Sequence, residues 1–275
     1  MGSDQTWIDQ YEPGLALSGE ATLPRNLLLR SLPSQDLERL YPFLHRVPLT
    51  PRRVLQHAGV SIEHLYFVEE GLVSVLAKTD EHNAAEVWLV GREGAVGSAA
   101  ALGIRTSTLS HFVQIGGSAL RIGVQDLNRA MSEIPSLRAV LHGYLHSTLV
   151  QSSQSAACSL RHSLLQRLAR WLLTAQDRSD MDALPITQDL LARSLGVRRP
   201  TVSEAFRVLE HRGIFGRERG LIRILDRGSL EQIACHCYRA MCIRRDRRER
   251  AEMRRRLLFT LSALCALFEI ELFAQ

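Results

Sequence analysis

The sequence predicts an α+β protein that consists of an N-terminal antiparallel β-roll of jelly-roll-like type, a long dimerisation helix and a C-terminal winged helix-turn-helix. Three observations predict this fold class. Short apolar segments separated by glycines fill residues 65–122, and a helical pattern of apolar residues follows from about residue 125. A helix, a glycine, a second helix and a basic hairpin then follow one another between Ile186 and Leu225. Apolar residues make up 45% of the 275 residues, enough for a substantial core.

We expect five segments along the chain. They are a flexible arm over residues 1–24, the β-roll over 25–134, the dimerisation helix over 135–158, the winged helix-turn-helix domain over 159–240, and a basic and then apolar tail over 241–275. The N-terminus is polar and acidic, so it does not resemble a secretory signal. Five cysteines at irregular spacing do not form a disulfide framework, and the expected location is therefore the reducing cytoplasm.

Within the β-roll segment, a helical pattern from Pro24 to Leu44 precedes the strands. Residues 87–90 are expected to form a strand between two hairpins. The first hairpin joins residues 65–68 to 72–76 through Glu69-Glu70-Gly71, and the second joins 112–115 to 119–122 through Gly116-Gly117. Short strands with glycine turns at this spacing are typical of an antiparallel barrel or sandwich.

The long helix is predicted after Pro135, where apolar residues from Leu137 to Leu149 recur at helical spacing. At about six turns it is too long to bury its apolar stripe on one small barrel, so a contact between two chains is expected. Packing of this helix within its own chain is the alternative. A further helix begins at Leu164 and is expected to end near Ala175.

The helix-turn-helix is predicted in detail. Thr187 is a suitable N-cap for its first helix, and Gly196 supplies the turn between the two helices. Pro200 lies in the first turn of the second helix, which is expected over about residues 199–211. Val202, Ala205, Phe206 and Leu209 form one apolar stripe on that helix, while the opposite face is polar and basic. A helix of this kind fits the major groove of DNA.

A hairpin wing with arginines placed to contact phosphates is predicted around Arg219-Gly220. Basic residues also gather in the last third of the chain, which suits double-stranded DNA as a partner. The residues expected to contact DNA are Thr187, Arg198, Arg199, Thr201, Ser203, Glu204, Arg207, Arg217 and Arg219.

Together these motifs resemble the Crp/Fnr family of bacterial transcription regulators over about residues 25–240. The resemblance rests on YFVEEGLVSV, GREGAVGSAAALG, the long central helix and ITQDLLARSLGVRRPTVSEAFRVLE. It implies a cyclic-nucleotide-binding-type β-roll, a homodimer on a two-fold symmetric DNA site, and RNA polymerase as a partner. The family's recognition helix commonly carries Arg, Glu and Arg, whereas this chain has Arg199, Pro200 and Glu204 at those positions. The DNA sequence that better-known members recognise therefore cannot be assumed for this chain.

The candidate effector pocket departs from the pattern of the cyclic-AMP-binding members. Those members hold the ribose and phosphate with a Glu and an Arg-Ser pair, and the matching positions here are Ser98 and Ser107-Thr108. A buried phosphate without a cation is poorly compensated, so we expect no tight binding of cyclic AMP. Arg105 would share a strand face with Ser107 and could supply the cation. The candidate pocket therefore comprises Gly97, Ser98, Arg105, Ser107 and Thr108, with an unknown small-molecule effector.

No cofactor or metal is expected. The N-terminal region has no cysteines, so it lacks the iron–sulfur ligands of the oxygen-sensing members. The histidines of the roll that could be compared with haem ligands are more typical of surface or hydrogen-bonded residues; they are His57, His64, His82 and His111. Cys235-His236-Cys237 and Cys242 could form a metal site or a redox-responsive thiol, but ordinary helix residues are favoured because the spacing matches no strong zinc pattern.

Three functions other than a DNA-binding scaffold are compatible with parts of the sequence or are excluded by it. The first is a regulator whose roll binds a small ligand that gates DNA affinity. An enzyme is not expected, since the sequence has no nucleophile elbow, P-loop or paired metal-ligand motif. A membrane-tethered DNA binder rests only on the apolar tail 257–275, which is short and carries Glu269 and Glu271, so no membrane partner is expected.

Overall fold

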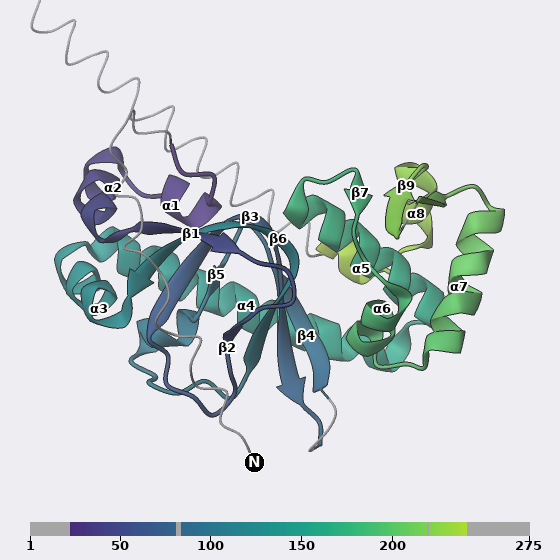
Figure 1. The fold of residues 1–275 in the computed structure, drawn as a ribbon, viewed down its shortest axis with the longest axis horizontal. Coiled ribbons are helices and arrows are strands. Elements are labelled where there is room, and N and C mark those ends of the chain that lie inside the picture. Colours follow the sequence, from purple (N-terminus) through teal and green to yellow (C-terminus); the bar gives the residue numbers. More distant parts are fainter. Residues whose placement is uncertain (1–22, 81–83, 219, 241–275) are drawn as a thin grey trace, which may run out of the picture.

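The computed structural model describes residues 23–80, 84–218 and 220–240, and the predicted α+β class is confirmed (Figure 1). A β-roll lies on the left of Figure 1 and a mostly helical C-terminal domain on the right, with a long helix connecting them. The predicted arm up to residue 22, the tail 241–275, His82, Arg219 and Cys242 lie outside the described residues. None of the described helices has the length and apolar character needed to cross a bilayer.

Short helices precede the roll, as the sequence predicts: α1 (Leu27–Arg30), α2 (Ser34–Leu40) and the 3-10 helix η1 (Tyr41–Phe43). Asn26 fixes their position because its side chain caps α1 and also reaches the sheet. Its Oδ1 accepts from the amides of Leu28 and Leu29, and its Nδ2 donates to the carbonyl oxygens of Val68 and Gly94. A fully buried amide with these four partners holds the N-terminal helices on the roll.

The roll is an antiparallel sheet with the strand order β1-β6-β3-β4. Strand β2 pairs with β6 and strand β5 with β3. A 3-10 helix, η2 (Ser98–Leu102), follows β5, and valines such as Val68, Val75 and Val113 fill the interior. The strands are β1 (His45–Leu49), β2 (Val54–Gln56), β3 (His64–Lys78), β4 (Ala84–Val90), β5 (Ala95–Val96) and β6 (Ser110–Gly123).

The two predicted hairpins are wrong, because residues 64–78 and 110–123 are each one continuous strand. Strands β3 and β6 pair along their length, with register shifts between Val68 and Val73. Gly117 lies against the backbone of Glu70, where a Cβ atom would clash with the Glu70 carbonyl oxygen. The glycines therefore allow two bulged strands to bend together at close approach, and they do not form turns.

Helix α3 (Val124–Glu133) leads into α4 (Pro135–Arg161), which begins with Pro135 in its first turn. The residues Leu137, Leu141 and Tyr144 of α4 are buried against the roll. The domain boundary predicted near Ser159 falls inside α4, since the helix continues to Arg161.

The C-terminal domain consists of helices around a small sheet of strand order β7-β9-β8. Helix α5 ends at Ser179 and not near Ala175, because Asp177 and Arg178 on its last turn bind Arg227 and Glu93. The elements are α5 (Leu164–Ser179), β7 (Ala183–Leu184), α6 (Gln188–Leu195), α7 (Arg199–His211), β8 (Phe215–Glu218), β9 (Leu221–Ile224) and α8 (Arg227–Ile233).

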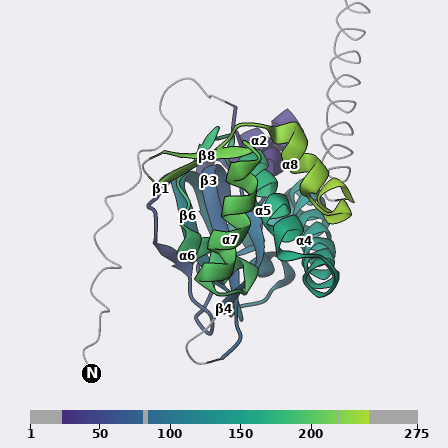
Figure 2. The same cartoon turned by 90° about the vertical axis from the view of Figure 1, so that its right-hand side faces the viewer.

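The two domains share a packed interface. Leu72, Leu89 and Ile115 of the roll belong to the same hydrophobic cluster as the core of the C-terminal domain. At its edge the carboxylate of Glu86, on β4, accepts from Trp171 Nε1 of α5 at 2.5 Å and from Ser194 Oγ of α6 at 2.9 Å. This interface places α5 and α6 beside the roll. Helix α7 lies on the side of its domain away from the roll in Figure 1 and faces the viewer in Figure 2.

Candidate nucleic-acid interface

Helices α6 and α7 form the predicted helix-turn-helix. Thr187 is the N-cap of α6, and its Oγ1 accepts from the amide of Leu190 at 3.3 Å. Gly196 ends the helix with φ of 64°, a left-handed conformation that glycine adopts without strain. Val202 and Phe206 of α7 are fully buried against α6, so the apolar stripe has the predicted role.

The opposite face of α7 is open to solvent. Exposed there are Arg198, Arg199, Thr201, Glu204 and Arg207. Arg199 forms an ion pair with Asp189 of α6 at 3.4 Å, but both side chains are more than half exposed, at 65% and 59%. An ion pair so exposed to water is weak, so Arg199 can exchange Asp189 for another acceptor.

Ser203 differs from its predicted neighbours because it is half-buried. Its hydroxyl donates to the carbonyl oxygen of Arg199 at 3.2 Å and accepts from the side-chain amide of Gln188, on α6, at 2.7 Å. The contact between Gln188 and Ser203 joins α6 to α7. Ser203 therefore helps to hold α7, and with it the exposed face, in position.

The predicted wing is present as strands β8 and β9, which pair with Glu218 opposite Leu221 across a two-residue connection. Arg217 on β8 binds the carboxylate of Glu210 at 2.5 and 3.0 Å, and its guanidinium lies over the ring of Phe206 at 5.1 Å. These contacts brace the wing against α7. The sequence predicts that Arg217 contacts phosphates, and it carries no local signal for the partner Glu210.

A match to a family model decides the class of this domain. The model of the Crp-like helix-turn-helix domain matches residues 166–233, which include α6, α7 and the wing. The chain carries a Crp-like helix-turn-helix domain. No curated protein sequence matches the chain.

Several solved structures are similar to this chain in overall fold. FixK2 from Bradyrhizobium japonicum is 16% identical with a TM-score of 0.61, covering 70% of this chain and 98% of that chain. The c-di-GMP-responsive global regulator CLP of Xanthomonas campestris is 17% identical with a TM-score of 0.59, covering 70% and 99%. A CRP/FNR-family transcriptional regulator from Thermus thermophilus is 23% identical with a TM-score of 0.55, covering 69% and 98%. The predicted resemblance to the Crp/Fnr family is confirmed for the helix-turn-helix domain by the family model and for the overall fold by these structures.

The residues of the candidate effector pocket lie near one another in sequence and outside the named strands. Residues 103–105 form no strand, and Arg105 is exposed whereas Ser107 is buried. The hydroxyl of Ser107 donates to the carbonyl oxygen of Leu109 and accepts from its amide, so it is already satisfied. Gly97 caps η2, which begins at Ser98, and Thr108 is exposed. Thr106, which lies between Arg105 and Ser107, forms an isolated antiparallel bridge with Ser61, and a shared face for Arg105 and Ser107 stays a prediction.

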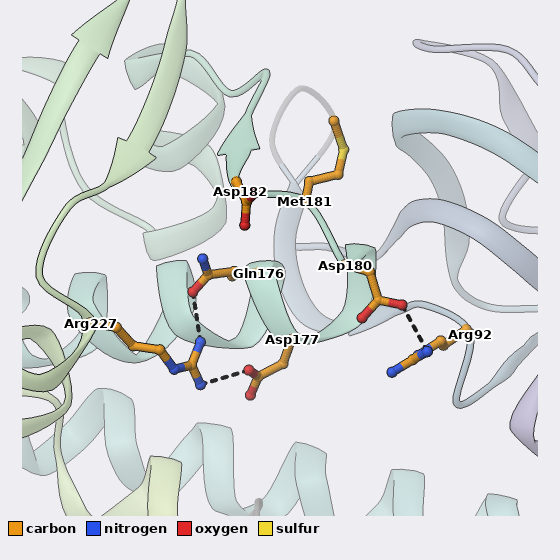
Figure 3. A pocket seen from close by; sticks show the side chains of 7 residues that line it. All are labelled: Arg92, Gln176, Asp177, Asp180, Met181, Asp182 and Arg227. Atoms are coloured by element: carbon orange, nitrogen blue, oxygen red, sulfur yellow. Dashed lines mark hydrogen bonds and ion pairs between the residues drawn. The ribbon is translucent and has the colours of Figure 1, made fainter.

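A different, polar pocket lies between the roll and α5 (Figure 3). Its arginines are paired: Arg227 binds Asp177 at 2.8 Å and Gln176 at 2.6 Å, and Arg92 binds Asp180 at 2.8 Å. None of the predicted effector residues lines this pocket.

The histidines of the roll are scattered. His57 is exposed, while His64 lies at the start of β3 and His111 pairs with Val75 near the other end of that strand. Burial lowers the pKa of His64, and burial lowers the pKa of His111 to about 4. These three candidate histidines therefore do not converge on one site.

The C-terminal cysteines are brought together with two residues that sequence reasoning missed. Cys235 and Cys237 lie beside Cys158 and His162, whereas His236 is exposed. The signal in the sequence was the spacing of four residues between Cys158 and His162, which places both on one side of a helix end.

Proposed function

We propose that this protein is a sequence-specific transcription regulator that binds a two-fold symmetric DNA site as a homodimer, with α7 in the major groove. The observation that carries the proposal is the division of α7 into a buried apolar face and an exposed face that bears Arg199, Thr201, Glu204 and Arg207. Helix-turn-helix proteins place such a face on the base edges. RNA polymerase is the protein partner that the family resemblance suggests.

Helix α4 supports the homodimer. Its exposed residues Leu149, Ser153, Ala156 and Leu160 are spaced by four, three and four residues, so they form one stripe along the helix. Leu149 is 65% and Leu160 is 84% exposed, although both are large and apolar. The other side of α4 binds its own chain, for example through Gln151, which accepts from Arg178. A second α4 would cover the stripe, and the small Ser153 and Ala156 would let the helices approach closely.

Replacing Leu149 with glutamate should weaken this dimer, because two buried carboxylates would face each other across the two-fold axis. We expect the dissociation constant to rise at least about tenfold, measured by sedimentation equilibrium. Leu102→Glu is the matched control, since Leu102 is 58% exposed on the roll and lies outside α4. A Leu149→Glu protein that dimerises as tightly as the unchanged protein would rule out α4 as the dimer interface.

Arg199 is proposed to bind a guanine through its guanidinium, and Glu204 to accept from a cytosine amino group. Replacing Arg199 with alanine should cost about 1–3 kcal/mol of binding free energy on the preferred site and relax discrimination at one base pair. Competition binding with single-base variants of the site measures both effects. Arg129→Ala is the control, because Arg129 is exposed on α3, far along the chain from α7. Equal weakening on every DNA sequence would instead make Arg199 a phosphate contact.

The other exposed groups, Thr187, Arg198, Thr201 and Arg207, are proposed to contact the DNA backbone or neighbouring bases. Arg217 is proposed to contact DNA from the wing. Arg219 is proposed to do the same on the basis of the sequence alone. Gating by a small ligand remains the alternative, since the neighbour CLP is described as responsive to c-di-GMP. A metabolite that raises the melting temperature of the chain and changes its DNA affinity would support this alternative.

A further inference from the structure

Four metal-ligating side chains meet where α4 ends and the chain leaves α8. Cys158 lies in the last turn of α4, and His162 is its C-cap residue. Cys235 and Cys237 follow α8, which ends at Ile233. One ligand atom from each residue lies within 4.8 Å of all the others, although the two pairs are more than 70 residues apart in sequence.

The separations fit one tetrahedral ion. The Sγ atoms of Cys158 and Cys235 are 3.4 Å apart, and Cys237 Sγ is 3.6 Å from His162 Nδ1. Sulfur ligands at about 2.3 Å from a zinc ion lie about 3.8 Å from one another in a tetrahedron. An iron–sulfur cluster would hold its thiolates farther apart, because several metal and sulfide ions lie between them. Three thiolates and one imidazole are a known ligand set of structural zinc.

Local structure explains why these four residues can converge. A spacing of four residues puts Cys158 and His162 on the same side of the end of α4. Residue 235 precedes a helical segment at 236–240, so Cys235 and Cys237 turn inward while His236 points to solvent. All three cysteines are buried, and they form a cluster separate from the hydrophobic cores.

The surroundings also suit a negatively charged metal centre. Gln154 Nε2 donates to Cys237 Sγ at 3.0 Å, as a second layer of ligand support does in metal sites. Arg167 interacts electrostatically with Cys158 and Cys235, and Arg170 interacts with Cys235. The Nε atoms of both arginines are buried and make no hydrogen bond within the described structure. Two cations therefore lie where three thiolates would leave an excess negative charge.

We propose that Cys158, His162, Cys235 and Cys237 bind one zinc ion as a structural site. On binding, the three thiols release their protons to solvent, three S–Zn bonds form, and neutral His162 donates the lone pair of Nδ1. No electron is transferred. With four protein ligands the coordination sphere is closed, so the ion has no open position for catalysis.

Such an ion would tie the end of the long helix to the C-terminal domain. The connection between α4 and α5 is only His162 and Ser163, so the domains are linked there by a very short segment. Zinc at this point would fix the direction in which α5 and the helix-turn-helix leave α4. Its removal should therefore loosen the C-terminal domain while the roll stays folded.

The test uses the full chain, purified in reducing buffer from cells supplied with zinc. Elemental analysis should find about one zinc ion per chain. Replacing the zinc with Co²⁺ should give the intense visible absorption of tetrahedral cobalt with thiolate ligands. Cys235→Ser and Cys237→Ser should lose most of the zinc and the cobalt spectrum. The controls Cys265→Ser and His142→Ala, outside the four ligands, should retain both.

The absorption spectrum of the cobalt-substituted wild-type chain tests the site without any substitution, so it is informative even if a ligand variant fails to fold. Zinc-free wild-type chains that give no thiolate–cobalt absorption when Co²⁺ is added would overturn the proposal. So would a Cys158–Cys235 disulfide in protein purified without added oxidant, since a redox pair would then occupy the site. An octahedral cobalt spectrum, which indicates oxygen ligands, would likewise contradict it.

Discussion

Replacing Phe206 with alanine should lower the free energy of unfolding of the C-terminal domain by about 3–5 kcal/mol. Phe206 is fully buried between α6 and α7 and packs edge-on against Phe215, with ring centroids 4.7 Å apart. The guanidinium of Arg217 also lies over its ring. One substitution therefore removes the core contact of α7, an aromatic pair and a cation–π contact with the wing.

Urea unfolding followed by tryptophan fluorescence measures this loss, because Trp171 lies in the same core. Val208→Ala is the control, since Val208 is on the same helix but 37% exposed, and it should cost far less. DNA binding should fall together with stability in Phe206→Ala. A loss below about 1 kcal/mol would mean that α7 is not anchored by this ring.

Replacing Glu86 with alanine should loosen the contact between the two domains. The Glu86 carboxylate accepts from Ser74, Trp171, Ser194 and Gln114, and Trp171 is itself buried. Each buried donor left without an acceptor costs about 1–3 kcal/mol. Limited proteolysis should therefore cut the connection between α4 and α5 faster in this variant, and melting should separate into two transitions.

The Glu86 carboxyl group should also make the free energy of unfolding depend on pH. Burial raises the pKa of Glu86, against the smaller lowering effect of its hydrogen bonds from Ser74, Trp171 and Ser194. The folded chain therefore holds this proton at a pH where the unfolded chain has lost it. The contribution of this proton to the free energy of unfolding is fully present below the ordinary pKa of a carboxyl group. It is lost as the pH rises through the raised pKa of Glu86.

Glu86→Gln, which cannot ionise, provides the comparison for this effect. Between the ordinary and the raised carboxyl pKa, the wild-type free energy of unfolding should decline with rising pH more steeply than that of Glu86→Gln. Urea titrations at a series of pH values measure both slopes. Equal slopes would show that the carboxyl is not held in its neutral form by the domain contact.

The sequence predicted best where local chemistry decides the structure. The cap at Thr187, the turn at Gly196 and the stripe from Val202 to Leu209 located α6 and α7 to within a residue or two. Each of these signals acts within one or two helical turns. The predicted turns at Gly71 and at Gly116-Gly117 were wrong because glycines at these positions are also compatible with two long strands that bend against each other.

The parts of the site that sequence reasoning missed depend on contacts between distant segments. Cys158 and His162 meet Cys235 only because α4 and α8 end at the same place. Glu86 directly precedes a predicted strand, and nothing in the sequence indicates its role. Its partners come from α5 and α6, which pack against it in the fold. Arg217 on β8 meets Glu210 of α7, a partner from another element, while its contact with phosphates stays a prediction. Such partners follow from tertiary packing, which local patterns do not specify.

We propose that two chains bind one symmetric DNA site through α7. The most direct measurement is selection of bound sequences from a random DNA pool by the full chain with no ligand added, followed by the mass of the selected complex. A two-fold symmetric consensus bound by two chains, with half-sites about one helical turn apart, is the expected result. No enriched sequence, or an asymmetric site bound by one chain, would contradict the account.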